Sequence, residues 1–167
     1  RVFLVDQANH TGYAQILEES TAVGGNPVKS YTLGDDVLSQ SVGGVVSHLL
    51  YDGHGSTRML AADTGTVTSR YDYDAYGVEL GIETGVTNPG ATDLRYCGEQ
   101  LDPQLKWNYH RARYYDSGVG RWNRVDPFSG DKYDPQSLHK YAYCHADPVN
   151  GIDPSGKLTL LHLIIGF

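Results

Sequence analysis

Several side chains in the second half of the sequence could do chemistry if the fold brought them together. Three histidines, His110, His139 and His145, could ligate a metal ion together with Asp131 or Glu99. No two of these histidines have the i, i+4 spacing that places two ligands on one face of a helix. Scattered, hydrogen-bonded histidines are therefore the simpler interpretation, and we expect no metal and no cofactor.

A second possibility is nucleophilic catalysis. Ser137 and His139 are close in sequence, but no Gly-x-Ser-x-Gly elbow surrounds any serine of the chain. The glycine pairs in "VGGNP" and "GGVVS" are not followed by the Lys-Ser or Lys-Thr that a phosphate-binding loop needs. These patterns predict turns, and neither predicts a hydrolase or a nucleotide site.

The stretch "YHRARYYDSGVGRWNRVDP", residues 109–127, gathers arginines, tyrosines and a tryptophan. It could be a nucleic-acid-binding patch, a catalytic segment or one face of a tyrosine-rich sheet. The whole chain carries a formal net charge of −7, which argues against a general affinity for polyanions because phosphate neutralisation supplies most of that affinity. We therefore expect these arginines to pair with carboxylates and aromatic rings, and we expect no nucleic-acid partner.

The chain has two cysteines, Cys97 and Cys144, far apart in the sequence. They match no CxxC metal pattern, and two thiols cannot build a disulfide framework. Free thiols and a single disulfide both stay open, and an extracellular setting would favour the bridge.

The elements that must position these residues are predicted to be strands. Tyrosine outnumbers phenylalanine by 13 to 3, and 20 glycines are spread along the chain, a composition that suits wet-faced strands joined by tight turns. Tyr51-Asp52 recurs as Tyr71-Asp72, which indicates repeated hairpins over residues 1–80. A lone hairpin is marginal in water, so these hairpins should pair edge to edge into one sheet. Residues 81–93 read as a loop.

Beyond residue 94 the repeat stops. Alternation over residues 107–115 predicts a single strand with Arg111 and Arg113 on one face. Residues 133–144 could form a short helix with Asp134 or Ser137 as its N-cap and Pro135 at its start. The apolar tail, residues 157–167, is too short to span a bilayer.

Three longer motifs identify a resemblance. The Tyr-Asp repeats, then "CGEQLDP" with "YHRARYYD" and "GRWNRVDP", then "SLHKYAYCHADPVNGIDPSG" resemble the Rhs/YD-repeat proteins and their repeat-associated core domain. The resemblance implies a mainly β fold: antiparallel hairpin repeats form a curved, spiralling sheet that is part of a β-shell, with one short helix near the C-terminus. Residues 1–80 would be the repeats and 94–156 the core domain. The core motif is carried by Gly98, Glu99, Arg111, Arg113, Tyr114, Tyr115, Asp116, Gly120, Arg121 and Trp122.

The resemblance also implies a pair of carboxylates. In toxin-bearing relatives two aspartates in Asp-Pro turns act as an aspartyl-protease-like pair, and they match Asp126 and Asp153. Two close carboxyls can share a proton, so that one activates water while the other protonates the leaving amide. Cleavage would fall in the region of Gly156, Lys157 and Leu158.

The alternative for both aspartates is ordinary turn chemistry, in which the carboxylate caps its own turn and proline fixes φ. The sequence also departs from the self-cleaving pattern: Asn150 stands where those members carry an arginine, and Lys157 where they carry a hydrophobic residue.

Three functions follow as expectations. The first is a structural closing segment of a bacterial, extracellular β-shell that encapsulates or presents a C-terminal passenger. The second is a self-cleaving core, at most a single-turnover aspartyl autoprotease, that releases a toxin. The third is a subunit of a tube or fibre that assembles through exposed strand edges. The expected partners are the rest of a parent polypeptide or identical copies, and a possible passenger.

Overall fold

The computed structural model describes residues 1–81, 91–157 and 160–161. The chain divides into two compact units. The first comprises Arg1–Asp52, Thr57–Tyr71 and Gly81–Thr92, and the second comprises Gly53–Ser56, Asp72–Leu80 and Asp93–Phe167.

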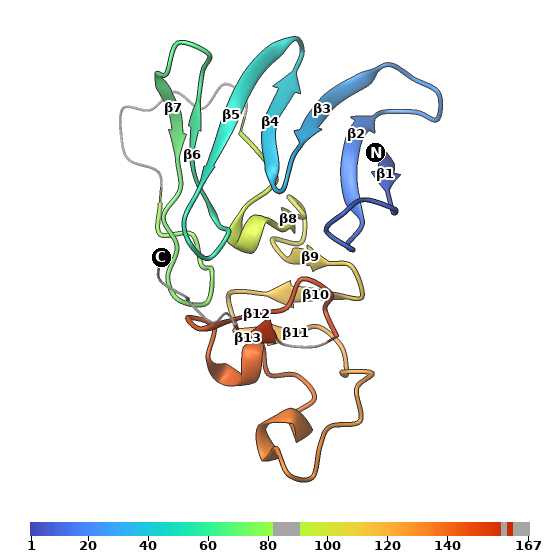
Figure 1. The fold of residues 1–167 in the computed structure, drawn as a ribbon, viewed down its shortest axis with the longest axis vertical. Helices are drawn as coiled ribbons and strands as arrows, with labels where there is room; N and C mark the ends of the chain where they lie inside the picture. Colours follow the sequence, from blue (N-terminus) through green and yellow to red (C-terminus); the bar gives the residue numbers. More distant parts are fainter. Residues whose placement is uncertain (82–90, 158–159, 162–167) are drawn as a thin grey trace. The chain divides into compact units, whose positions relative to one another are not determined.

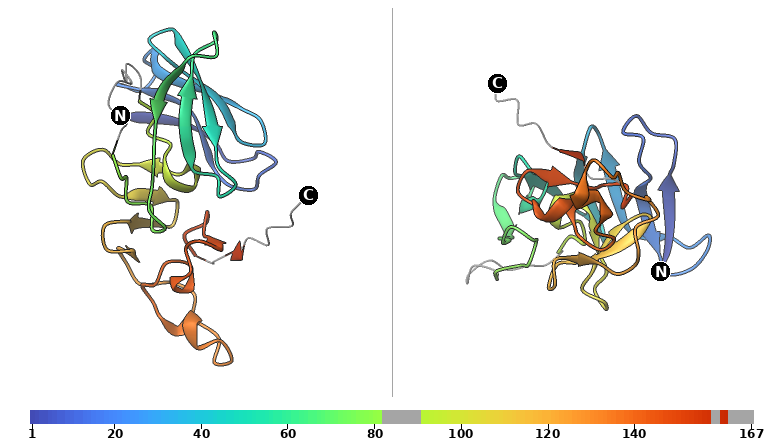
Figure 2. Two further views of the ribbon diagram at one scale, coloured as in Figure 1. Left: turned by 90° about the vertical axis from the view of Figure 1, so that its left-hand side faces the viewer. Right: turned by 90° about the horizontal axis from the view of Figure 1, so that it is seen from below.

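The first unit is an antiparallel sheet of seven strands that follow one another in sequence order (Figure 1). Its strands are β1 (Val2–Asp6), β2 (Gln15–Ser20), β3 (Pro27–Leu33), β4 (Val37–Val42), β5 (Val45–Tyr51), β6 (Thr57–Ala61) and β7 (Val67–Arg70). Each strand pairs with the next through a turn, as repeated hairpins must when they share one sheet. Figure 2 shows the twist of this sheet from two further directions.

One face of this sheet is buried although many of its side chains are polar. Glu19, Lys29 and Gln40 are nearly inaccessible to solvent, and so is Tyr31. The Tyr31 hydroxyl donates a hydrogen bond of 2.7 Å to Glu19, and Tyr31 lies opposite Gln40 in the register of β3 and β4. The hydrogen bond between Tyr31 and Glu19 satisfies two of these buried polar groups.

The second unit contains a four-stranded antiparallel sheet and short 3-10 turns. Along the chain its elements are η1 (Tyr96–Gly98), β8 (Gln100–Leu101), β9 (Asn108–His110), β10 (Arg113–Asp116), β11 (Arg121–Trp122), η2 (Pro135–Leu138), η3 (Cys144–Ala146), β12 (Gly151–Ile152) and β13 (Leu160–Leu161). Strands β11, β10, β9 and β8 lie in this order, and β12 pairs with β13.

Aromatic rings form the core of the second unit. Its buried cluster consists of Tyr96, Tyr115, Trp122, Tyr143 and Cys144. The rings of Tyr115 and Tyr143 stack with centroids 4.0 Å apart, and the Tyr115 hydroxyl donates to the Tyr76 carbonyl at 2.7 Å. The stretch of residues 109–127 therefore contributes Tyr115 and Trp122 to this core, and the Tyr115 hydroxyl has the acceptor that a buried hydroxyl needs.

The single strand predicted for residues 107–115 is wrong. The chain turns at Arg111, whose φ is +60°, and β9 pairs back on β10 with Arg113 opposite His110. This turn changes the phase of the alternation, so Asn108 and His110 are buried together with Arg113 and Tyr115. A non-glycine residue in the left-handed region is uncommon, and the alternating pattern of side chains does not predict it.

The helix predicted within residues 133–144 is reduced to the single 3-10 turn η2. Its start is as predicted: the Asp134 side chain accepts a hydrogen bond from the Gln136 amide, and proline occupies the first turn. Leu158 and most of the apolar tail lie outside the described residues. The described part of the tail includes Leu160 and Leu161, which pair with Ile152 and Gly151.

The prediction of a mainly β fold built from antiparallel hairpins is confirmed. Of the helical turns within the described ranges, none is long and apolar enough to cross a membrane.

Candidate functional site

Arg113 brings the two predicted aspartates together. Its Nη2 atom lies 2.7 Å from Asp126 Oδ2 and 3.4 Å from Asp153 Oδ2. Because both oxygens contact the same nitrogen, they are at most about 6 Å apart. Two carboxylates from distant turns thus share one cation.

Two of the three charged side chains in this ion-pair cluster are buried almost completely. The side chains of Arg113 and Asp153 are 1% and 2% exposed, whereas that of Asp126 is 18% exposed. Burial lowers the pKa of Arg113 from its usual value, and the Asp126 and Asp153 carboxylates oppose that effect. The guanidinium also lies 4.0 Å over the Trp122 ring, an arrangement that favours a cation.

Both aspartates also cap their own turns, as the turn alternative predicts. Asp126 Oδ1 accepts the Phe128 amide at 2.8 Å, and Asp153 Oδ1 accepts the Ser155 hydroxyl at 2.9 Å. Each carboxylate therefore uses one oxygen for its turn and the other for Arg113. The turn role and the paired role coexist in the same side chains.

The segment from Arg111 to Arg113 holds the turn after Asp153 through three successive carbonyl groups. Arg111 Nη1 donates to the Pro154 carbonyl, the Ala112 amide to that of Ser155, and Arg113 Nε to that of Gly156. We call this arrangement the carbonyl clamp. The β9–β10 turn makes this clamp possible, because it directs the side chains of Arg111 and Arg113 and the backbone amide of Ala112 toward the same turn.

Gly156 is required by this close approach. Its φ is +66°, and a Cβ atom there would lie 2.3 Å from the His110 carbonyl oxygen and 3.0 Å from the Arg113 amide nitrogen. Both contacts are with backbone, which cannot rotate away, so only glycine fits.

The peptide bond between Gly156 and Lys157 is held at both ends. Its carbonyl oxygen accepts from Arg113 Nε, and its amide nitrogen donates to Asp153 Oδ1 at 3.1 Å. A guanidinium at the carbonyl oxygen and a carboxyl at the nitrogen are the groups that amide hydrolysis needs at these two atoms.

Glu99 forms a second buried ion pair next to the same turn, with the guanidinium of Arg111. Its two oxygens lie 2.8 and 3.0 Å from Arg111 Nη1. Burial raises the pKa of Glu99 to about 7, with Arg111 opposing the rise and Asp153 adding to it.

His110 contacts the turn after β12 through its imidazole ring. Its Nδ1 atom lies 2.8 Å from the Asp153 carbonyl oxygen, so Nδ1 carries the proton and donates. Burial lowers the pKa of His110 to about 3; the hydrogen bond to Asp153 opposes this, and the charges of Arg111 and Arg113 add to it. The imidazole is therefore neutral over the physiological range.

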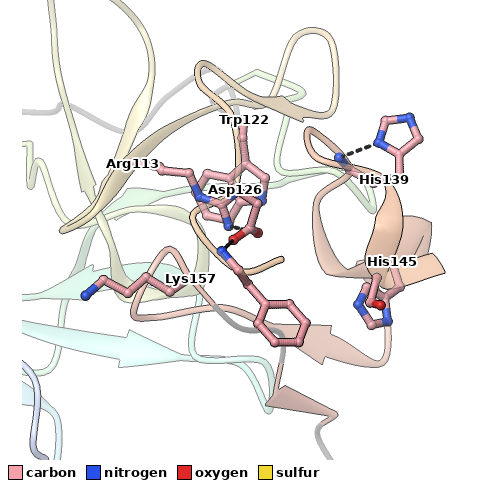
Figure 3. A pocket seen from close by; sticks show the side chains of 9 residues that line it. Arg113, Trp122, Asp126, His139, His145 and Lys157 are labelled. Carbon is pink, nitrogen blue, oxygen red and sulfur yellow. Dashed lines mark hydrogen bonds and ion pairs between the residues drawn. The ribbon is translucent and has the colours of Figure 1, made fainter. Parts of the chain in front are cut away.

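A small cavity opens beside Arg113 and Asp126 (Figure 3). Its lining residues are Arg113, Trp122, Asp126, Phe128, Ser137, His139, Ala142, His145 and Lys157. Figure 3 shows Arg113 and Asp126 pointing toward each other on one side, with His139 and His145 on the other. Polar groups face a space where a water molecule could approach Asp126.

The histidines and carboxylates considered as metal ligands do not form a cluster in the described part of the chain. Within residues 1–81, 91–157 and 160–161 the structure holds no group of three or more His, Cys, Asp or Glu residues that could bind a metal ion. Cys97 and Cys144 are not joined by a disulfide, and Cys97 Sγ lies 3.6 Å from the Tyr143 hydroxyl.

The remaining core-motif residues frame the site. The Asp116 carboxylate caps the turn between β10 and β11 by accepting the Gly118 amide, and the Tyr114 ring packs on Tyr109. Arg121 is exposed. The sequence did not single out His110 as a support of the Asp153 turn. That role depends on the left-handed conformation of the next residue, Arg111, which the residue types do not predict.

No family model matches the chain. In sequence it is 32% identical over 141 residues to the tRNA3(Ser)-specific nuclease WapA of Bacillus spizizenii, a match that covers 83% of this chain and 6% of the relative. It is 38% identical over 123 residues to salivary gland surface protein 1 of Aedes aegypti, which covers 71% of this chain and 3% of that protein. The chain thus spans a small fraction of the length of these relatives.

In structure the chain resembles a crystal structure of TcdB2-TccC3, with a TM-score of 0.62 and 22% identity, covering 86% of this chain and 7% of that one. This likeness concerns the fold. Together the comparisons show that the chain is similar in sequence to the Rhs-type WapA toxins and in fold to a TccC3-containing Tc toxin component.

Proposed function

We propose that this chain is the closing segment of an extracellular Rhs/YD-repeat β-shell that holds a C-terminal passenger. The observation that carries the proposal is the carbonyl clamp, in which Arg111, Ala112 and Arg113 grip the last turn of the core. The clamp fixes the direction in which the chain leaves Gly156 toward a passenger.

The WapA relatives are named as nucleases, and this chain spans about 6% of their length. We therefore attribute such an activity to a passenger outside this segment. The partners of this segment are then the rest of its parent polypeptide and that passenger.

The test is protection of the passenger in the intact parent polypeptide. Gly156→Ala places a methyl group against the backbone of His110 and Arg113, so it should open the clamp and expose the passenger to added protease. Gly44→Ala is the matched control, because Gly44 also has a positive φ, +84°, but no atom within 4 Å of the added Cβ. Equal protease resistance of both variants would refute the closing role.

A second function is favoured by one specific observation, the two-ended grip on the Gly156–Lys157 peptide bond. We infer that Asp126 and Asp153 cut this bond once. Water in the cavity gives a proton to Asp126 as its oxygen attacks the Gly156 carbonyl carbon. For this step Asp153 carries a proton at the outset and Asp126 is ionised. Arg113 holds the carbonyl oxygen, the bond to the Lys157 nitrogen breaks, and that nitrogen takes the Asp153 proton while Asp126 keeps the proton from water. A carboxyl group at Gly156 and an amine at Lys157 result.

The mass of a longer chain that extends past Phe167 tests this step. Cleavage should split the chain after Gly156, and either Asp126→Asn or Asp153→Asn should prevent it. Asp147→Asn is the control, since Asp147 also precedes a proline but pairs with the Asn150 side chain. An uncut wild-type chain at both pH 5 and pH 7 would leave the two aspartates as turn and ion-pair residues.

A further inference from the structure

The Glu99–Arg111 pair reaches the Asp153–Gly156 turn by a route that does not involve Asp126. Arg111 Nη1 contacts both oxygens of Glu99 and also donates to the Pro154 carbonyl. The Glu99 side chain is 9% exposed and that of Arg111 is 25% exposed. A buried carboxylate therefore orients the guanidinium that holds the first carbonyl group of the clamp.

The protonation state of Glu99 decides how firmly it orients Arg111. The charged groups that act on Glu99 are Arg111, from the β9–β10 turn, and Asp153, from the turn after β12. An ionised Glu99 makes two charge-assisted contacts with the guanidinium, whereas a protonated Glu99 offers a neutral acceptor. Arg111 is partly exposed, so it can turn toward solvent once its anionic partner is lost. Burial places the titration of Glu99 near neutral pH.

We propose that Glu99 is a positioning residue for the Asp153–Gly156 turn: its carboxylate fixes Arg111 against the Pro154 carbonyl, and a proton on Glu99 loosens the turn. This inference rests on the proposed self-cleavage only where cleavage is the readout, because the turn carries the Gly156–Lys157 bond. The exchange experiment below tests the positioning role without any cleavage.

The direct test is amide hydrogen exchange of the chain between pH 5.5 and pH 8, expressed as protection relative to the unstructured rate. The amides to follow are those of Gly156 and Lys157, which donate to the Asp153 carbonyl and carboxylate. In the wild type their protection should rise about tenfold as the pH passes about 7, the effect of gaining a charge-assisted hydrogen bond. Glu99→Gln should keep the low protection at every pH.

Two comparisons keep the test specific. Glu79→Gln removes another glutamate–arginine pair of the same unit, Glu79 with Arg95 at 3.3 Å, and should leave the protection profile of the turn as in the wild type. Arg111→Lys keeps the charge but lacks the planar fork, so it should lower protection at pH 8 and flatten the step.

The inference fails if Glu99→Gln retains the wild-type profile at Gly156 and Lys157. It also fails if Glu99→Gln lowers the protection of the Tyr115 amide in β10 by the same factor, since Glu99 would then contribute only to general stability. In a longer chain, absence of wild-type cleavage would refute the proposed self-cleavage and leave the exchange result in force. If cleavage occurs, Glu99→Gln should slow it at pH 8 and have little effect at pH 5.5.

Discussion

Glu99 and His110 should have opposite effects on stability as the pH falls. The pKa of Glu99 is raised from 4.5 to about 7, so the folded chain binds a proton that the unfolded chain does not bind between these values. The Glu99 contribution to stability is therefore fully present below pH 4.5 and is lost as the pH rises through 7. Acidification from pH 7 to pH 5 recovers about 2 kcal/mol of global unfolding free energy, because the reference is an unfolded chain with an exposed Glu99. The loosening of the turn is a local equilibrium in which Glu99 stays buried and loses only its contact with Arg111, so it has the opposite sign.

His110 has the reverse sign. Its pKa is lowered from 6.5 to about 3, so between these values the unfolded chain binds the additional proton. The contribution of neutral His110 is present above pH 6.5 and is lost as the pH falls toward 3. From pH 7 to pH 5 this loss amounts to about 2 kcal/mol, which nearly cancels the gain from Glu99.

Single substitutions should reveal the separate contributions of Glu99 and His110 to the pH dependence of the unfolding free energy. In Glu99→Gln the unfolding free energy should fall by about 2 kcal/mol more than in the wild type between pH 7 and pH 5, because only His110 still titrates. In His110→Asn, whose amide can still donate to the Asp153 carbonyl, it should rise by about 2 kcal/mol relative to the wild type over the same interval. Urea unfolding at each pH, followed by the fluorescence of buried Trp122, measures both.

The comparison is between the pH dependences of the unfolding free energy of the variants and the wild type, so the contributions of carboxylates elsewhere in the chain cancel. A double variant should return to the wild-type pH dependence, since both titrations are removed. Parallel profiles for the wild type and both single variants would show that neither burial nor the Arg111 pairing shifts these groups, and the account of the site would have to be abandoned.

Two further substitutions test the packing of the site. Arg113→Met leaves the buried Asp153 carboxylate without its cation and should cost about 3–5 kcal/mol of unfolding free energy; Arg121→Met, on an exposed arginine of β11, should change it by less than about 0.5 kcal/mol. A comparable loss in both would contradict the ion-pair cluster. Tyr115→Phe removes the donor to the Tyr76 carbonyl and should cost about 1 kcal/mol in urea unfolding, whereas Tyr114→Phe should be nearly neutral; equal costs would refute that hydrogen bond's contribution.

The hairpin sheet could be predicted from local patterns. The recurrence of Tyr51-Asp52 at Tyr71-Asp72 and the glycine turns between apolar strands reflect period-two burial and turn chemistry, both short-range properties. The pairing of Arg111 and Arg113 with carboxylates was also predicted, because the net charge of −7 argues against phosphate binding and leaves carboxylates and aromatic rings as partners. Which carboxylates they meet could not be predicted.

The rest depends on a backbone conformation that side-chain types do not announce. Arg111 adopts a positive φ, which inverts the alternation and turns His110 and Arg113 inward. The same turn exposes the Ala112 amide to the Ser155 carbonyl, and with it the carbonyl clamp. The sequence singled out Glu99 only as a core-motif residue and a possible metal ligand, and its raised pKa appears only once the fold has buried it.

The position of Arg113 also decides which variants can separate the structural function from the catalytic one. Its guanidinium holds Asp126, Asp153 and the Gly156 carbonyl together, so Arg113→Met should destroy the closure and any cleavage alike. Asp153→Asn is more informative. An asparagine oxygen can still accept the Lys157 amide and the Ser155 hydroxyl, but its amide cannot supply the proton that the leaving nitrogen needs. A folded, protease-resistant Asp153→Asn chain that no longer cuts itself would therefore show that Asp153 acts in cleavage in addition to its structural role in the turn.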